Sequence, residues 1–302
     1  PKNLLVEGGK VLITGKSGIG KSYLALQWAF ELSLGQPLCT KYELKHAVNT
    51  LYIQVEVAEP LLAQSWRRLE RVYERPTGRL FTASPREFLL KEDAGQLGAL
   101  IERLGIGCVI FDPWYLMHMG SEISSEFIVP SLLAVNHLSF DYGILSMIVA
   151  HEKKPSFNQS GNELQQGLAA VSGHHAFTNW PDTVAMVQRS GAGIQIEWEK
   201  TRHTEGNVKP LQLVWTPTIP FALPDSKYAA AKEAKMYTMV TRILLDAGGE
   251  MPLAVLVGQL ESDSQFSESS ARRLISEMQS LDMLTLQRAG RTSIIRLGGV
   301  DE

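Results

Sequence analysis

Short apolar runs alternate with amphipathic stretches along the first half of the chain. The apolar runs, each about four to seven residues long, predict buried strands at 11–14, 50–55, 79–83, 107–111 and 144–150. Between them, apolar residues recur three or four positions apart, which predicts helices at 22–34, 59–75, 93–104 and 127–140. Strands that alternate with helices in this way are typical of an α/β fold, in which helices cover both faces of a mostly parallel, twisted sheet.

The pattern changes beyond residue 150. Residues 153–173 are polar and rich in Gly, Ser, Asn and Gln, which predicts a long loop. Three more strands are expected at 183–188, 194–198 and 211–215, and a Ser-Gly-Ala-Gly turn joins the first two as a hairpin. Three prolines between Thr216 and Pro224 then predict a linker.

A second unit begins near Asp225. Its apolar spacing predicts three helices, at 228–246, 253–260 and 268–281, and two strands, at 285–288 and 293–297. Three helices followed by a β-hairpin are typical of a small winged-helix domain. We therefore expect one domain over residues 1–216, a Pro-rich linker over 217–226 and a winged helix over 227–302.

The turn between the first strand and the first helix carries the clearest chemical signal. Its sequence, G-K-S-G-I-G-K-S, fits the phosphate-binding P-loop pattern G-x-x-x-x-G-K-[ST]. The glycines let backbone N–H groups turn toward phosphates, Lys21 would reach the β- and γ-phosphates, and Ser22 would ligate Mg²⁺. We therefore predict that ATP and Mg²⁺ are bound by Gly15, Lys16, Ser17, Gly18, Ile19, Gly20, Lys21 and Ser22.

Two carboxylates follow other predicted strands. Asp112 directly follows the strand at 107–111, where it could hold Mg²⁺ together with Ser22. Pro113 follows it, so the group that activates water must come from elsewhere in the sequence. Glu56 follows the strand at 50–55 and is our candidate base, because the carboxyl ends of parallel strands form the active edge of a sheet. Glu59 is the alternative, although it could instead begin the next helix.

Three further polar residues stand at strand ends. His151 follows the strand at 144–150 and is predicted to contact the γ-phosphate. Lys200 and Arg202 follow the strand at 194–198 and share one face because their spacing is two. They could reach a phosphate bound by a neighbouring subunit, as an arginine finger does. Each of these residues could also be an ordinary solvated side chain.

Composition narrows the class of protein. The formal net charge is −3, so any contact with nucleic acid must come from a local patch. Two cysteines form neither a disulfide framework nor a zinc site, and we expect a cytoplasmic protein without a membrane span or signal peptide.

Two segments are candidates for contact with nucleic acid. In the loop after His151, Lys153 and Lys154 could contact DNA phosphates, although a surface loop without such a role is the alternative. In the second unit, Arg272 and Arg273 lie on the third helix. This unit has nine Lys and Arg residues against eleven Asp and Glu residues, so the sequence favours neither DNA nor a protein as its partner.

Together these segments resemble the RecA-core ATPases, and within them the RepA-like hexameric helicases of plasmids and phages. The resemblance covers roughly residues 1–216 and rests on the P-loop, the strand ending in Glu56, the Val-Ile-Phe-Asp-Pro segment at 109–113, the Ala-His-Glu-Lys-Lys segment at 150–154 and the Glu-Lys-Thr-Arg segment at 199–202. The chain departs from the family at Ala150, where the family has His, and at His174 and His175, where it has small residues.

The resemblance implies a function for the whole set. It implies a ring, commonly a hexamer, with ATP between neighbouring subunits, Glu56 as the base, and His151 as the link between the nucleotide and the inner loops. It also implies that Lys200 and Arg202 act on the neighbour's nucleotide and that single-stranded DNA lies in the central channel. We therefore expect a replicative helicase of a mobile element; the alternative is an ATP-gated DNA-binding regulator or helicase loader that does not unwind DNA.

Overall fold

A computed structural model describes residues 3–73, 78–120, 124–152, 177, 179–191, 193–216, 219–226, 229, 232–264, 266–280, 283–290 and 292–298. The chain divides into two compact units. The first comprises residues 1–16, 21–188 and 196–211, and the second comprises residues 17–20, 189–195 and 212–302.

Among the described residues, nine strands form one large sheet in the order β3-β2-β4-β5-β1-β6-β7-β8-β9. Neighbouring strands from β3 to β6 run parallel, whereas β8 and β9 pair antiparallel. The strand bounds are β1 Lys10–Thr14, β2 Thr50–Gln54, β3 Leu80–Ala83, β4 Cys108–Asp112, β5 Leu145–Val149, β6 Thr183–Ser190, β7 Gly193–Thr201, β8 Leu211–Trp215 and β9 Phe221–Ala222.

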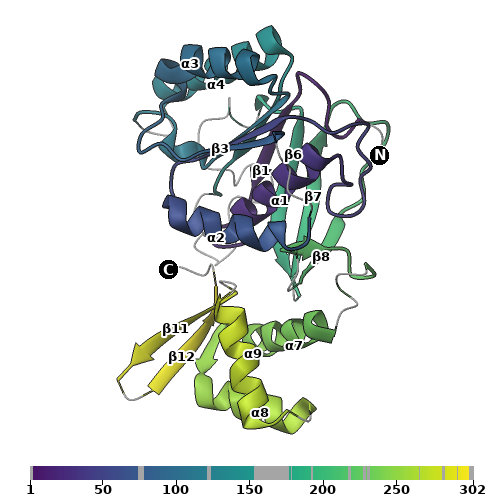
Figure 1. The fold of residues 1–302 in the computed structure, drawn as a ribbon, viewed down its shortest axis with the longest axis vertical. Coiled ribbons are helices and arrows are strands. Elements are labelled where there is room, and N and C mark those ends of the chain that lie inside the picture. The colour runs from purple at the N-terminus through teal and green to yellow at the C-terminus, as the bar shows by residue number, and fades with distance from the viewer. Residues whose placement is uncertain are drawn as a thin grey trace, which may run out of the picture. The chain divides into compact units, whose positions relative to one another are not determined.

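Helices connect the parallel strands (Figure 1). Their bounds are α1 Lys21–Leu34, α2 Glu59–Glu70, α3 Leu90–Leu104 and α4 Ser125–Tyr142, with a short 3₁₀ helix, η1, at Trp114–Leu116. The α/β fold with a mostly parallel sheet is therefore confirmed. No described helix is long and apolar enough to span a bilayer.

Alternate residues of the strands supply one core of the first unit. Leu51, Val109 and Ile148 point to the same face of the sheet, because side chains two positions apart along a strand share a face. They pack against Ile101 of α3 and Val135 of α4, all at most 2% exposed. Burying aliphatic side chains of this size contributes about 1.5–3 kcal/mol each, which is enough to hold the sheet edge in one geometry.

Two helix boundaries differ from their predictions for local reasons. Helix α3 begins at Leu90 rather than Asp93, because the Asp93 carboxylate accepts the Leu89 N–H at 2.8 Å and so satisfies a free donor of the first turn. Helix α2 ends at Glu70 rather than at residue 75, and the chain then turns so that the Tyr73 hydroxyl donates to Glu31 at 2.7 Å.

The predicted linker at 217–226 needs a correction. Within it, Phe221 and Ala222 form β9 and are both fully buried. Thr216 closes the turn before them, since its hydroxyl accepts the Ile219 N–H at 3.1 Å. Pro220 and Pro224 therefore border an edge strand of the sheet, where a missing N–H costs little.

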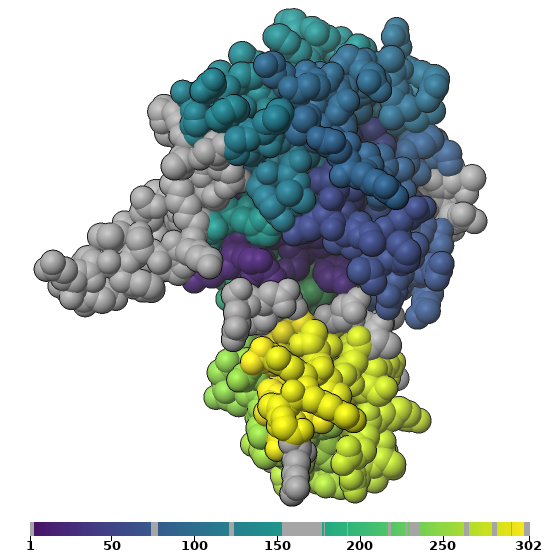
Figure 2. Space-filling model, turned by 90° about the vertical axis from the view of Figure 1, so that its left-hand side faces the viewer, coloured from purple at the N-terminus to yellow at the C-terminus, as the bar shows by residue number. Residues whose placement is uncertain are grey.

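The C-terminal unit contains α7 Lys232–Asp246, β10 Glu250–Pro252, α8 Leu253–Ser264, α9 Glu268–Ser280, β11 Leu284–Ala289 and β12 Thr292–Leu297. Its strands form an antiparallel sheet in the order β10-β12-β11. Tyr237, Leu260, Met278 and Ile295 share a separate core. The sequence pattern did not reveal β10, because three residues are too few to show an alternation. Figure 2 shows the surface of these elements in green to yellow.

Candidate nucleotide site

Four strands that are neighbours in the sheet end in the four groups that the sequence singled out. In the order β1-β5-β4-β2, they lead to the P-loop, His151, Asp112 and Glu56. Because these strands are parallel, their carboxyl ends lie along one edge of the sheet. Topology therefore gathers residues that are up to 136 positions apart in the sequence, as His151 is from Gly15.

The P-loop backbone needs its glycines. Gly15 has φ +153°, and a Cβ there would lie 2.3 Å from the Val187 carbonyl oxygen. Gly20 has φ +94°, and a Cβ there would lie 2.9 Å from the Phe221 ring. Phe221, which belongs to the segment predicted to be a linker, thus limits the space beside Gly20. Both positions combine a backbone conformation that favours glycine with a lack of space for any side chain.

Lys21 is the first residue of α1, and its side chain is 4% exposed. Its Nζ donates to the carbonyl oxygens of Gly15 and Lys16, both at 2.8 Å, and lies 3.2 Å from Nδ1 of His151. Burial lowers the pKa of Lys21 to about 8, although Asp112, Glu152 and Glu56 nearby favour its charged form. Among the described residues Lys21 has no ion-pair partner within 4.0 Å, so its charge is available to an incoming anion.

Asp112 is fully buried at the end of β4, where both of its carboxylate oxygens accept hydrogen bonds. Ser22 Oγ donates to Oδ1 at 3.1 Å and Tyr52 OH donates to Oδ2 at 2.5 Å. Burial raises the pKa of Asp112 to about 6, against the opposing effect of these two donors.

A carboxylate and a hydroxyl side by side are hard oxygen ligands of the kind that Mg²⁺ prefers, with phosphate oxygens and water as the other ligands. Ser22 and Asp112 therefore fit the cation that P-loop sites use.

Glu56 lies two residues beyond β2, and its side chain is exposed. The buried Gln54 side chain accepts the Glu56 N–H at 3.0 Å and the Val57 N–H at 2.7 Å, which fixes the backbone of this turn. The Tyr115 hydroxyl donates to Glu56 Oε1 at 2.7 Å. Glu59, the alternative base, is the first residue of α2, where a carboxylate favourably meets the positive end of the helix.

His151 follows β5 and connects two parts of this edge. Its Nδ1 lies 3.2 Å from Lys21 Nζ, and its ring meets the Tyr115 ring at a centroid distance of 5.6 Å with an interplanar angle of 60°. A phosphate bound by Lys21 would therefore lie close to His151. The predicted contact of His151 with the γ-phosphate stays a prediction.

Lys200 and Arg202 lie at the other end of β1. Arg202 NH1 donates to Asp182 Oδ1 at 3.1 Å, and Asp182 Oδ2 accepts the N–H of Lys10, the first residue of β1. Lys200 Nζ and Arg202 NH2 both donate to the Asn179 carbonyl. The P-loop begins after the last residue of β1, so about 15 Å of strand separates these cations from this chain's own phosphate site.

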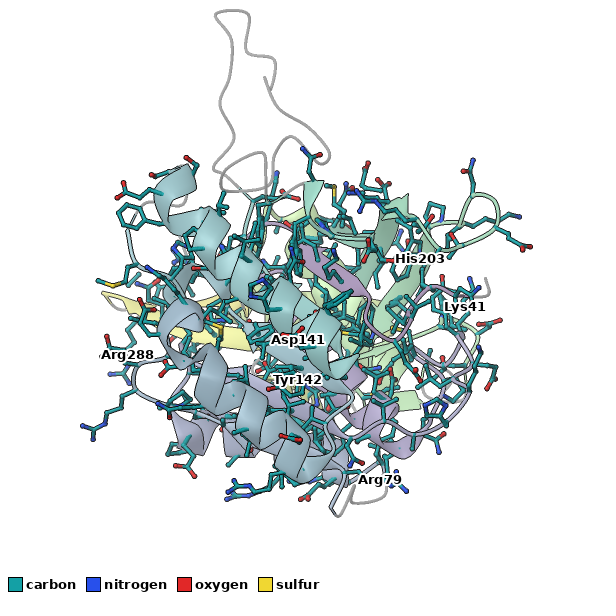
Figure 3. The ribbon with its side chains drawn as sticks, turned by 90° about the horizontal axis from the view of Figure 1, so that it is seen from above. Lys41, Arg79, Asp141, Tyr142, His203 and Arg288 are labelled. Carbon is teal, nitrogen blue, oxygen red and sulfur yellow. The ribbon has the colours of Figure 1, made fainter. Side chains whose placement is uncertain are left out.

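The residues predicted to contact nucleic acid are only partly covered by the structure. Lys153 and Lys154 lie outside the described residues, as do His174 and His175. On α9, Arg272 and Arg273 are exposed, and Arg272 Nε pairs with Glu268 Oε1 at 2.9 Å. Arg288 on β11, labelled in Figure 3, is also exposed.

Sequence reasoning missed three side chains of this edge: Tyr52, Gln54 and Tyr115. Each contacts a residue that the motifs did identify, respectively Asp112, the Glu56 backbone and the Glu56 carboxylate. Tyr52 lies in the middle of the apolar strand β2 and Gln54 ends it, so a polar group in that apolar run was the available signal. Tyr115 had none, because it lies in a short 3₁₀ turn.

Comparison with known proteins supports the reading of this edge. Residues 1–156 match the protein family described as AAA domain. The match spans the P-loop, Glu56, Asp112 and His151. The comparison with curated proteins gave no match.

Proposed function

This chain belongs to the AAA-domain family of P-loop ATPases, and we propose that it is an oligomeric, Mg-ATP-hydrolysing motor that acts on DNA, in the manner of RepA-like replicative helicases of mobile elements. One observation carries the proposal: the P-loop, His151, Asp112 and Glu56 end four adjacent parallel strands at a single sheet edge. Phosphoryl transfer to water requires a loop that binds the phosphates, a pair of ligands for a cation and a separate carboxylate.

Each of these groups has a task in the reaction. Lys21 would hold the β- and γ-phosphates and offset the charge that develops on them. Ser22 and Asp112 would hold Mg²⁺, which would further neutralise the phosphate charge when bound. Glu56 would orient a water molecule in line with the γ-phosphate and take its proton. The Gln54 side chain holds the turn that carries Glu56, so the carboxylate begins from a fixed backbone.

The position of the finger residues favours an oligomer. Lys200 and Arg202 lie beside the start of β1, whereas the P-loop follows its end. This position supports a role for these cations at a neighbouring subunit's nucleotide rather than at their own. A hexameric ring, as in the RepA-like helicases, is the assembly we propose.

The DNA contacts are proposed from the sequence order and the C-terminal unit. Lys153 and Lys154 follow His151 directly, so a loop that carries them would respond to the nucleotide. The C-terminal order of helix, strand, two helices and two strands supports a winged-helix assignment. Its exposed Arg272 and Arg273 suit DNA phosphates, while its excess of acidic residues suits a protein partner equally well.

The first test compares two carboxylates. Glu56→Gln is expected to lower ATP turnover by about 10²–10⁴-fold and to leave nucleotide affinity unchanged, because the amide cannot accept the water's proton. Glu59→Gln, on the first turn of α2, is the matched control and is expected to keep turnover within about twofold. Phosphate release measures turnover, and binding of a fluorescent ATP analogue measures affinity. Normal turnover in Glu56→Gln would contradict the assignment of the base.

The second test mixes two inactive variants. Arg202→Ala and Lys21→Ala disable opposite sides of a shared site, so mixed oligomers are expected to recover part of the ATPase activity that each lacks alone. If the mixture stays as inactive as its components at every ratio, the finger does not act between subunits.

A forked DNA substrate separates the motor from its alternative. A motor is expected to displace a labelled strand only when ATP is hydrolysed, and Glu56→Gln is expected to displace none. Nucleotide-dependent binding of the fork without displacement would instead support an ATP-gated DNA-binding regulator or helicase loader.

A further inference from the structure

Tyr115 contacts two residues of the nucleotide site that come from different strands. Its hydroxyl donates to Glu56 Oε1 at 2.7 Å, and its ring meets the His151 ring at 5.6 Å. His151 in turn lies 3.2 Å from the Lys21 ammonium. The side chains of Glu56, Tyr115, His151 and Lys21 therefore form a continuous series of contacts from the candidate base to the P-loop.

We propose that Tyr115 is a positioning residue that orients the Glu56 carboxylate for attack by water and ties that orientation to the His151–Lys21 pair. The inference rests on the proposed function, since it assumes that Glu56 is the base. It adds a residue that no motif in the sequence identifies.

The Glu56 side chain needs such a partner because it is exposed. Gln54 holds only the backbone of this turn, so the carboxylate would otherwise sample several rotamers in water. A hydrogen bond from Tyr115 to Oε1 leaves Oε2 to accept a proton. In the step we propose, the water oxygen bonds to the γ-phosphorus, its proton passes to Glu56, and the bond to the bridging oxygen breaks to release ADP and phosphate.

Tyr115 is presented on an anchored turn. Trp114, directly before it, and Met117, two residues after it, are at most 1% exposed and belong to the apolar core. The Met117 N–H donates to the Trp114 carbonyl, and the Met117 carbonyl accepts the Leu90 N–H of α3, both at 2.9 Å. A site residue held by a packed second layer in this way keeps its geometry within the tolerance that catalysis requires.

The turn also explains how the nucleotide could act through Tyr115. A γ-phosphate that draws the Lys21 ammonium away from the Gly15 and Lys16 carbonyls alters the contact between Lys21 and His151. The Tyr115 ring rests against His151 at an angle of 60°, so it senses the position of that imidazole. The hydroxyl at the other end of the ring then sets the Glu56 carboxylate.

The test removes a single oxygen atom. Tyr115→Phe keeps the ring against His151 and deletes only the donor to Glu56. We expect kcat to fall about tenfold, because a misplaced reacting group costs rate steeply, while KM, the affinity for a fluorescent ATP analogue and the melting temperature stay unchanged. The matched control is Tyr142→Phe at the end of α4 (Figure 3), since Tyr142 is 41% exposed and Tyr115 is 37% exposed; its kcat is expected to stay normal.

A double variant shows whether the effect runs through Glu56. In the Glu56→Gln background, Tyr115→Phe is expected to cause no further loss of residual turnover, because two residues that act as one unit are not additive. A full additional tenfold loss would overturn the proposal, and so would a normal or raised kcat in Tyr115→Phe alone. A loss that appears in KM, affinity and melting together would show a structural role and would also overturn it.

The outcomes distinguish this inference from the function on which it rests. If Glu56→Gln is inactive and Tyr115→Phe is fully active, only the role of Tyr115 fails. If Glu56→Gln retains normal turnover, the assignment of the base fails, and the proposed role of Tyr115 fails with it.

Discussion

Helix α1 buries a charged residue at each end, and both stand where the helix dipole disfavours them. Lys21 is the first residue, near the positive end, and Glu31 lies in the last turn, near the negative end. Lys21 is 4% exposed and Glu31 is fully buried. Burial lowers the pKa of Lys21 to about 8 and raises the pKa of Glu31 to about 7. Burial therefore disfavours the charged form of both side chains.

The partners at the two ends differ in kind. Glu31 is enclosed by donors from the chain itself: Gln27 Nε2 at 2.9 Å, Tyr73 OH at 2.7 Å and the Cys39 N–H at 2.9 Å. Lys21 contacts two carbonyl oxygens and an imidazole nitrogen, and the described residues give it no carboxylate within 4.0 Å. A buried cation at a helix start, beside a P-loop, is thus complete only with an anion. A buried ionisable side chain therefore marks a ligand site when its polar partners are incomplete, as at Lys21, and a structural role when the fold supplies its hydrogen-bond partners, as at Glu31.

The largest expected effect comes from Lys21→Met. We expect ATP turnover to fall at least 10²–10³-fold, because the main cation facing the phosphates is lost. The free energy of unfolding is expected to stay the same or to rise, since a buried charge without a counterion is replaced by an apolar chain of similar length. Phosphate release and denaturant unfolding measure the two quantities. A loss of stability above about 1 kcal/mol would make Lys21 a structural residue and would break the contrast with Glu31.

Glu31→Ala is expected to give the opposite result. Removing this carboxylate leaves the Gln27, Cys39 and Tyr73 donors buried without an acceptor, and it also opens a cavity. We expect the free energy of unfolding to fall by about 2–4 kcal/mol at pH 5.5, with turnover per folded molecule unchanged. Denaturant unfolding at that pH avoids the cost of burying the charge, because the native carboxyl then holds its proton. A turnover loss that exceeds the folded fraction would place Glu31 in the catalytic machinery.

The sequence predicted the Lys21 end of this helix and not the Glu31 end. A P-loop needs particular residues at particular spacings because its backbone closely contacts a ligand. A pattern of eight adjacent residues is therefore enough to identify it. Glu31 draws its partners from α1, from residue 39 and from residue 73 after α2. Nothing in local spacing brings these together, and an acidic residue on a helix normally indicates a solvated face.

The same difference explains the rest of the site. Strand ends carrying Glu56, Asp112 and His151 could be found because parallel strands share an edge. Tyr115 and Phe221 could not, since each reaches its partner through tertiary packing of a short turn or edge strand. The α/β fold followed from apolar periodicity, whereas β9 and β10, of two and three residues, are too short to show a period.

The pH dependence of stability sharpens the comparison. Because the native pKa of Glu31 is about 7 and its ordinary value is 4.5, the native state binds its proton more tightly than the unfolded state does. This contribution to stability is complete below pH 4.5 and is lost as pH rises to about 7, by up to about 3 kcal/mol. The raised pKa of Asp112 also lowers stability as pH rises, but this loss is nearly complete at its native pKa of about 6.

Between pH 6 and 7, Glu31 is therefore expected to dominate the slope. Wild type should lose about 1 kcal/mol of unfolding free energy between pH 6 and pH 7. Glu31→Gln, which cannot titrate, should lose much less. Asp112→Asn is the control, because it is expected to keep the slope. Equal slopes in wild type and Glu31→Gln would show that Glu31 does not carry a raised pKa.

The smallest expected effect comes from removing one of the hydrogen-bond donors to Glu31, the Tyr73 hydroxyl. Tyr73→Phe removes the hydroxyl at 2.7 Å from Glu31 Oε1 and keeps the ring packed near Phe30. A donor to a carboxylate favours its charged form, so its removal raises the pKa of Glu31 further. We expect a loss of about 1 kcal/mol at pH 8, where Glu31 is charged, and a smaller loss at pH 5.5, where it is protonated. Denaturant unfolding of Tyr142→Phe at both pH values controls for the loss of a hydroxyl elsewhere. A loss for Tyr73→Phe that is the same at both pH values would mean that the hydroxyl serves packing rather than the buried charge, and the contrast between the two ends of α1 would then rest on Gln27 and the Cys39 N–H.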